Sequence, residues 1–333
     1  MEWKTRLNKL LGIKYPIIQG AFAGFGDSRL AAPVSEAGCL GMITAGALKT
    51  PENLRKDIIR ARSITDKPIA VNLSMGMCPM VEEMREVAIE EGIPVAETSV
   101  FNAAEHGRRF KEAGVKWIHK VATVQHAVAA AKQGADAVII VGIEGTGFKS
   151  ISQLPLTIAI PWAVTQIDVP VIAAGGIGSG RGLIASLALG AEGIYMGTAF
   201  MATRECSITE KHKEFLVKSM PTDPQIRDKT LTPPDPEKLK KVMEKRGKTE
   251  QNQWLRQLER VVLKETAKGA TDDNALDTEE VLVLAPGSLA VGFLNEICSV
   301  SELINRIVEE ANKVLMHGFL GENLGSTGTG VVK

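Results

Sequence analysis

A short run of β-branched and apolar residues, followed by a loop and an amphipathic segment, recurs from Pro16 to Thr203, and this repeat is what most limits how the chain can fold. The apolar runs are too continuous for strands with one solvated face and are typical of parallel strands covered on both faces. We therefore expect eight strands, at residues 16–20, 40–46, 68–74, 95–100, 117–121, 137–142, 171–177 and 193–199.

Helix signals fill the intervals between these runs. Thr50 precedes Pro51, which is the pattern of an N-cap followed by proline at the first helical position, and Asn102 and Thr123 occupy similar places. Glycines stand where helices should end, at positions 38, 114, 134 and 190. Eight strand–helix units in register predict the α/β class and a (β/α)8 TIM barrel, although a doubly wound open sheet has the same local signals.

The chain changes character after Thr203, and we expect four parts. Residues 1–205 form the barrel and its site, and residues 206–285 form a charged helical insertion or lid, in which 221–280 are rich in charge and proline and Trp254 is an anchor. Residues 286–320 form a segment and a helix that packs back on the barrel, and 321–333 form a flexible tail. The helix begins with a capping box, Ser299 and Glu302, and its apolar stripe comprises Leu303, Ile307, Ala311 and Val314.

Composition excludes several kinds of partner. The net charge is zero and aromatic residues make up 5% of the chain, which argues against nucleic acid and anionic membrane surfaces. No apolar stretch approaches the length of a membrane span or of a signal peptide, so we expect a cytoplasmic protein. The four cysteines are far apart, which predicts free thiols and no metal site. The sequence is compatible with a homodimer.

A glycine-rich turn after the seventh expected strand is the most informative motif. In VIAAGGIGSGRG (171–182) a strand runs into closely spaced glycines, and Ser179 is placed to cap the next helix. Glycines let backbone N–H groups approach an anion, and barrels of this class commonly bind phosphate at the loops after strands seven and eight. A tight turn that needs glycine only for steric reasons remains the alternative.

Two similar motifs do not have the spacing that their chemistry requires. Arg181 stands where the last glycine of a dinucleotide-binding G-x-G-x-x-G would be. In GIEGTGFKS (142–150) Phe148 displaces Lys149 by one position from a P-loop lysine, so we reject a nucleotide triphosphatase.

Five segments together resemble the nitronate monooxygenase family, also called 2-nitropropane dioxygenase-like. They are KYPIIQGAFAG, PIAVNLS, HKVATVQHA, ADAVIIVGIEGTG and AAGGIGSGRGLIASLALGAEGIYMGTAFMAT, and the resemblance covers roughly residues 10–205. That family includes flavin-dependent enoyl-acyl-carrier-protein reductases and NADH:quinone reductases. The resemblance implies a TIM barrel that binds FMN and acts on a small-molecule substrate.

The resemblance also implies roles for individual residues. Gly20, Ala21 and Phe22 would lie against the flavin ring, while Asn72 and Lys120 would lie at its pyrimidine edge, where a cation stabilises negative charge on the reduced ring. The remaining cofactor-binding positions, centred on the phosphate, are Gly145, Ala174, Gly175, Gly176, Met196, Gly197 and Thr198. The alternatives are a loop-bonding amide for Asn72 and an ordinary surface lysine for Lys120.

One departure from the family pattern bears on the chemistry. Phe148 stands where the family has a histidine that is assigned a base or substrate-orienting role, and phenylalanine cannot move a proton. With Phe22 and Phe25 it would line an apolar pocket over the flavin. Glu144 is a conspicuous acid at the expected mouth, where it would anchor substrate or backbone or cap a loop, so the catalytic candidates are Lys120, Phe148 and Glu144.

Other polar residues receive plainer interpretations. His119 should be packed away from the face of Lys120 because strand side chains alternate. His106, His212 and His317 are interpreted as surface helix residues, and Tyr195 as barrel packing.

These observations favour an FMN-dependent oxidoreductase that uses NADH or NADPH to reduce an enoyl thioester, another activated alkene or a quinone. The alternatives are a nitronate monooxygenase that uses O2, and an FMN-binding accessory protein whose residues 221–280 dock a partner. A barrel that binds a phosphosugar without flavin is a further alternative.

Overall fold

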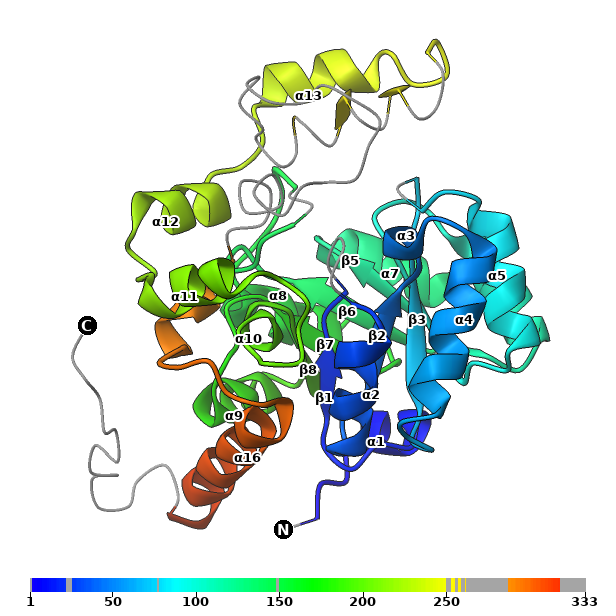
Figure 1. The fold of residues 1–333 in the computed structure, drawn as a ribbon. Helices are drawn as coiled ribbons and strands as arrows, with labels where there is room; N and C mark the ends of the chain where they lie inside the picture. The colour runs from blue at the N-terminus through cyan, green and yellow to red at the C-terminus, as the bar shows by residue number, and fades with distance from the viewer. Residues whose placement is uncertain are drawn as a thin grey trace.

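The computed structural model describes residues 2–21, 26–76, 78–147, 150–249, 253–254, 257–258, 261 and 287–317. Eight parallel strands form one sheet in the order β1-β8-β7-β6-β5-β4-β3-β2, with helices around it (Figure 1). The strands are β1 Ile17–Gln19, β2 Gly41–Thr44, β3 Ile69–Ser74, β4 Val95–Ser99, β5 Lys116–Val121, β6 Ala137–Val141, β7 Val171–Ala174 and β8 Gly193–Met196. Each expected strand is present, although several end earlier than expected; the last ends at Met196, because the next helix begins at Thr198.

The sheet closes between β1 and β2, which distinguishes a barrel from an open doubly wound sheet. Ile18 and Leu40 form a parallel bridge, and the backbone N–H of Gln19 donates to Leu40 O at 2.9 Å. The Gln19 side chain extends the ladder: its Nε2 donates to Met42 O at 2.9 Å, and its Oε1 accepts from Met42 N at 3.1 Å. The structure therefore confirms the (β/α)8 TIM barrel.

The helices begin close to where the capping residues predict. Around the strands lie α1 Arg6–Leu11, α2 Ser28–Glu36, α3 Ala45–Leu48, α4 Pro51–Arg62, α5 Val81–Glu90, α6 Ala104–Glu112, α7 Val124–Lys132, α8 Leu156–Val164, α9 Gly180–Ala188 and α10 Thr198–Met201. Thr50, Thr123 and Ser179 each accept a backbone N–H from the first turn of the helix that follows. Asn102 also accepts such a bond, from Ala104 N, but the cap position itself is Ala103, one residue later than expected.

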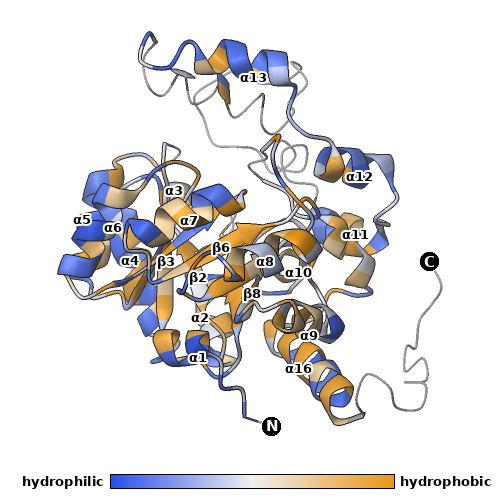
Figure 2. Ribbon diagram, turned by 180° about the vertical axis from the view of Figure 1, so that it is seen from behind, coloured by the Kyte–Doolittle hydropathy of each residue, from blue (hydrophilic) through white to orange (hydrophobic). Residues whose placement is uncertain are grey.

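Apolar side chains form two layers, one inside the barrel and one between the strands and the helices. The inner layer consists of alternate strand residues such as Ile18, Val95 and Ile139, and Leu7 and Leu11 of α1 close its lower end. The strands are apolar and the outer helices carry most of the polar surface, as Figure 2 shows. The polar groups of the upper end of the barrel therefore stand above a closed apolar floor.

The C-terminal part of the chain leaves the barrel and returns. It comprises α11 Glu210–Lys218, α12 Pro224–Leu231, α13 Pro236–Met243, the 3₁₀ helix η1 Leu289–Phe293 and α16 Val300–His317. In Figures 1 and 2 α13 stands above the end of the barrel opposite α1. Trp254 anchors this excursion, because it is buried and its ring lies 5.7 Å from that of Phe101, which follows β4. No described helix is long and apolar enough to span a bilayer.

Helix α16 packs on α9, as its apolar stripe predicts. Ser299 and Glu302 form the expected capping box, with Ser299 N donating to Glu302 Oε2 at 2.6 Å and Glu302 N to Ser299 Oγ at 3.1 Å. A Cβ at Gly180 would lie 2.3 Å from Ile307 O, so the two helices meet backbone to backbone at this glycine. The carboxylate of Glu310 accepts the Gly180 N–H at 2.7 Å.

Candidate active site

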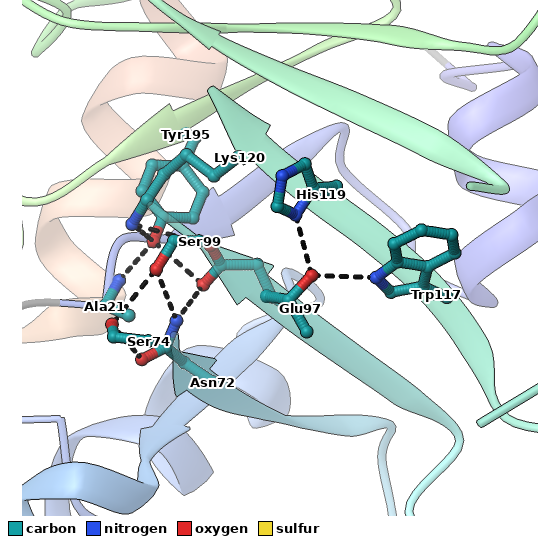
Figure 3. Close-up of polar contacts among 10 residues, drawn as sticks. Ala21, Asn72, Ser74, Glu97, Ser99, Trp117, His119, Lys120 and Tyr195 are labelled. Atoms are coloured by element: carbon teal, nitrogen blue, oxygen red, sulfur yellow. Dashed lines mark hydrogen bonds and ion pairs between the residues drawn. The ribbon is translucent and has the colours of Figure 1, made fainter. Parts of the chain in front are cut away.

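Four polar side chains meet inside the upper end of the barrel. They are Asn72 on β3, Glu97 on β4, Lys120 on β5 and Tyr195 on β8, and Figure 3 shows them pointing toward one another. Strand alternation places these side chains inside the barrel. Asn72, Glu97 and Lys120 each come two residues after an apolar residue of the inner layer, and Tyr195 is itself part of that layer. We call these four residues the polar cluster.

The hydroxyl group of Tyr195 joins most of the cluster. Lys120 Nζ donates to it at 2.9 Å, and the backbone N–H of Ala21 donates to it at 2.5 Å. The hydroxyl in turn donates to Glu97 Oε2 at 3.4 Å. Tyr195 thus fixes the chain just after β1 to the lysine on β5, across the barrel.

The carboxylate of Glu97 is the charge partner of Lys120. Its Oε2 accepts from Asn72 Nδ2 at 2.5 Å, and its Oε1 lies 3.5 Å from Lys120 Nζ. Glu97 is fully buried, whereas 18% of the Lys120 side chain is exposed. The ammonium group is therefore the member of the pair that can reach a ligand at the mouth.

Burial and mutual attraction shift the protonation equilibria of the cluster. Burial raises the pKa of the Glu97 carboxyl, against the opposing effects of Lys120 and Asn72. Burial alone would lower the pKa of Lys120, but the charge of Glu97 and the contact with Tyr195 outweigh it, so the pKa lies above its usual value. Burial, followed by the nearby charge of Glu97, raises the pKa of Tyr195. At neutral pH the cluster therefore holds an ammonium group and a neutral phenol.

The sequence-based interpretation missed Glu97 and the hydrogen bonding of Tyr195. The alternation of the segment VAETS could have revealed Glu97, because Val95 belongs to the inner layer and Glu97 and Ser99 must then share its face. Ser99 Oγ lies 3.0 Å from Ser74 Oγ, which donates to Asn72 Oδ1 at 3.2 Å. These two hydroxyl groups carry the polar lining up to the rim.

A glycine cradle lies at the ends of β6, β7 and β8. Gly175 and Gly176 have φ angles of +110° and +68°, which other residues rarely adopt. A Cβ at Gly175 would lie 2.8 Å from Gly145 N, and one at Gly176 would lie 2.8 Å from Glu144 Cβ. The same holds at β1, where a Cβ at Gly20 would lie 2.9 Å from Met196 O. The loops need glycine because their backbones touch.

The amide groups of this cradle can bind an anion. Within the described ranges, the N–H groups of Gly176 and Gly197 donate to no other residue. In the first turn of α9, by contrast, two amides already have side-chain partners, because Ser179 accepts from Gly182 N and Glu310 accepts from Gly180 N. The amides around Gly176 and Gly197 are therefore available to an anion at this end of the barrel.

A residue from far along the chain supports the β8 side of the cradle. Thr198 Oγ1 accepts from Ser288 N at 3.0 Å and lies 3.0 Å from Ser288 Oγ. Ala174 and Met196 are buried at the ends of their strands, beside the cradle. The expected phosphate-site residues Ala174 to Gly176 and Met196 to Thr198 are thus next to one another in space, at the ends of the paired strands β7 and β8.

Of the catalytic candidates Glu144 and Phe148, the structure describes only Glu144. The carboxylate of Glu144 accepts from Leu156 N at 3.1 Å and so caps the start of α8, which corresponds to the loop-cap alternative. Phe148, like Phe22 and Phe25, lies outside the described residues.

The structure agrees with the interpretation of His119 but not with that of His212. His119 is buried and faces away from Lys120, as expected, and its Nδ1 lies 2.7 Å from Thr98 Oγ1. Trp117 Nε1 donates to the same Thr98 oxygen at 2.7 Å (Figure 3). The surface interpretation of His212 is wrong: it is 1% exposed, because α11 turns that face inward.

Comparison with known proteins places this geometry in a family. The family model described as nitronate monooxygenase matches residues 4–310. A (3aS,4S,5R,7aS)-5-hydroxy-7a-methyl-1-oxo-octahydro-1H-indene-4-carboxyl-CoA dehydrogenase from Rhodococcus jostii is 34% identical over 65% of this chain and 61% of its own length. A probable nitronate monooxygenase from Staphylococcus saprophyticus is 35% identical over 67% of this chain and 75% of its own length.

Among solved structures, FabK from Thermotoga maritima superposes with a TM-score of 0.73 at 32% identity, covering 94% of this chain and 97% of that one. The family model therefore covers the barrel, the excursion and most of α16. The resemblance seen in the sequence is confirmed: the chain belongs to the nitronate monooxygenase family of oxidoreductases.

Proposed function

We propose that the protein is an FMN-dependent oxidoreductase that reduces an organic acceptor with NADH or NADPH. The observation that carries this proposal is the placement of the Lys120 ammonium group and the Asn72 amide on one side of the barrel mouth, with unpaired glycine amides at the ends of β7 and β8. A cation and an amide suit the polar edge of a flavin ring, and free backbone N–H groups suit its phosphate.

The cofactor would supply the electron chemistry, since a flavin takes up two electrons from one substrate and passes them to another. The protein would hold the flavin and adjust how easily its ring accepts negative charge. Lys120, fixed by Glu97 and Tyr195, would favour negative charge at the ring edge, and Asn72 would hydrogen-bond that edge. Ala21 would bring the backbone after β1 against the ring, because its N–H is tied to Tyr195.

Glycine at four positions supports phosphate binding in the cradle. Side chains at Gly20 or Gly175 would collide with backbone, one at Gly145 would collide with the side chain of Val141, and one at Gly176 would collide with that of Glu144. The loops therefore leave no room for a side chain at these positions. The amides of Gly176 and Gly197 are left for the phosphate.

An enoyl thioester is the acceptor that we favour over other activated alkenes and quinones. The Rhodococcus relative is named as a dehydrogenase of a carboxyl-CoA compound, so it acts on a thioester. Phe148, where the family histidine would stand, removes the proton-moving group that nitronate oxidation uses and adds apolar surface.

Nitronate oxidation by O2 is the second candidate, because the Staphylococcus relative carries the name of that activity. It requires a group other than residue 148 to orient the nitronate, and Lys120 is the described cation at the mouth that could do so.

An anaerobic flavin-reduction screen tests these proposals. The purified protein should be yellow, and NADH or NADPH should bleach the flavin band, which an enoyl thioester should restore. Bleaching by a nitronate but not by either nicotinamide would favour the second candidate. A yellow protein that no donor bleaches would support the binding-only alternative, and a colourless protein that takes up no FMN would exclude all three.

A further inference from the structure

A cavity of about 420 Å³ lies beside the barrel mouth, between the loops that follow β3 and β4 and the chain after α13. Its lining includes Met75 and Phe101 from the barrel, His106 from α6, and Arg246, Thr249 and Trp254 from the excursion. Its volume falls within the range of small-molecule sites. We call it the excursion cavity.

Two aromatic rings and a guanidinium group form one wall of the excursion cavity. The rings of Phe101 and Trp254 lie 5.7 Å apart, and Arg246 Cζ lies 5.9 Å and 5.7 Å from their centroids. Trp254 is held in place by a hydrogen bond from its Nε1 to Val242 O at 2.8 Å. Such a wall suits a flat, electron-rich ring.

Arg246 is exposed and, among the residues that the structure describes, has no carboxylate ion-pair partner. Residues 238–248, KLKKVMEKRGK, contain five lysines and one arginine against one glutamate, although the whole chain has no net charge. Glu82 also lies in the lining of the cavity. Arg246 is the cation of this segment that lines the cavity, where it would attract an anion.

The excursion cavity borders the segments that directly follow the polar ends of β3 and β4. Met75 follows Ser74 directly, and Phe101 comes two residues after Ser99, and these two serine hydroxyl groups are 3.0 Å apart. A ligand whose reactive end lies over Asn72 and Lys120 would therefore extend past Ser74 and Ser99 into the cavity. An elongated ligand with an aromatic, anionic far end fits this path.

We propose that the excursion cavity binds the adenosine-phosphate end of a substrate of the barrel site, with the base against Phe101, Trp254 and Arg246 and the phosphates against Arg246 and the lysines of 238–248. This rests on the proposed function, since both an acyl-coenzyme A and a nicotinamide dinucleotide carry that group. The excursion then serves as the recognition element for the non-reacting end.

Calorimetric titration of the FMN-loaded protein with two fragments tests the proposal. Adenosine 3′,5′-bisphosphate represents the thioester source, and 2′-phospho-ADP-ribose represents the nicotinamide source. We expect at least one fragment to bind, and Arg246→Ala to weaken it by about tenfold, the equivalent of about 1.4 kcal/mol. Phe101→Leu should weaken it as well, while Arg227→Ala, on α12 outside the cavity, should leave it unchanged.

The fragment that binds identifies the source, and binding of both indicates that the two substrates use the cavity in turn. If neither fragment binds, or if binding is the same in Arg246→Ala and Phe101→Leu as in the unmodified chain, the proposal is wrong. The fragments have no redox group, so this result is independent of flavin reduction. Failure of the proposed function would instead appear as fragment binding to a protein whose flavin no donor reduces.

Discussion

Lys120 and Tyr195 lie on β5 and β8, which β6 and β7 separate in the sheet, and the ammonium nitrogen of the first is 2.9 Å from the hydroxyl oxygen of the second. The ammonium also lies 4.8 Å from the centroid of the Tyr195 ring. Because the same hydroxyl accepts the Ala21 N–H, this contact ties the loop after β1 to the charge at the mouth.

Replacing Tyr195 by phenylalanine tests that connection. The change removes the shared oxygen and leaves the Ala21 N–H and one Lys120 hydrogen without a partner, at a cost of about 1–3 kcal/mol. We expect FMN to bind about tenfold more weakly, as measured by quenching of flavin fluorescence. Tyr15→Phe, on the other end of the barrel, is the matched control. Equal FMN affinity in both variants would show that the Tyr195 hydroxyl does not organise the site.

Opposite charge changes at Lys120 and Glu97 should shift the flavin reduction potential in opposite directions. Lys120→Met removes the cation that favours the reduced ring, so the potential should fall, whereas Glu97→Gln removes the charge that offsets Lys120, so it should rise. Each shift should be on the order of tens of millivolts, since about 30 mV corresponds to 1.4 kcal/mol for two electrons. Spectroelectrochemical titration measures both. A shift of the same sign in the two variants would contradict the proposed role of the pair.

Gly176→Ala should weaken FMN binding, whereas a glycine substitution of similar backbone strain elsewhere should lower only the folding free energy. The alanine would need a φ of +68° and would bring its Cβ to 2.8 Å from Glu144 Cβ, which would displace the loop whose amides we propose to bind the phosphate. Gly92→Ala is the control, because its φ of +60° imposes similar strain but a Cβ there meets nothing within 4 Å. Each change should cost about 1–2 kcal/mol of folding free energy. FMN dissociation constants should differ from the unmodified chain only in Gly176→Ala.

His119 should make stability fall in mild acid. Burial lowers its pKa to about 4, against the opposing effect of a hydrogen bond with Thr98, so the ring is neutral in the folded protein at pH 7. A base whose pKa is lowered by folding stabilises above its unfolded pKa of about 6.5, and that contribution is lost as the pH falls toward 4. The full loss is on the order of 3 kcal/mol. Urea unfolding at pH 7 and pH 4.5 should show it in the unmodified chain and much less in His119→Asn.

The exposed His126 supplies the control for this measurement. His126→Gln should keep the pH dependence of the unmodified chain. If His119→Asn keeps it too, another buried group is responsible, and His212, whose pKa burial also lowers to about 4, is the next to replace.

The barrel could be predicted because its signals are local. The continuous runs at β3, β6 and β7, the caps Thr50 and Thr123, and the glycines before β2, β5, β6 and β8 act within a few residues of themselves. The glycine cradle could also be predicted from the sequence, because most of its residues directly follow β7 and β8.

The charge arrangement could not be predicted in the same way. The role of Glu97 depends on Asn72, Lys120 and Tyr195, which reach it from three other strands, and a composition rule places glutamate on the surface. His212 illustrates the same difficulty, because the direction in which α11 turns depends on what packs against it. Residues that act through distant neighbours need the register of the sheet before their roles can be seen.

The contacts of Ser288 with Thr198 and of Glu310 with Gly180 have a consequence for how the holoprotein matures. They join positions 90 and 130 residues apart, so two supports of the cradle are synthesised long after the strands they serve. A nascent chain can close its barrel before either support has left the ribosome. Cofactor uptake should therefore be a late step that follows synthesis of α16.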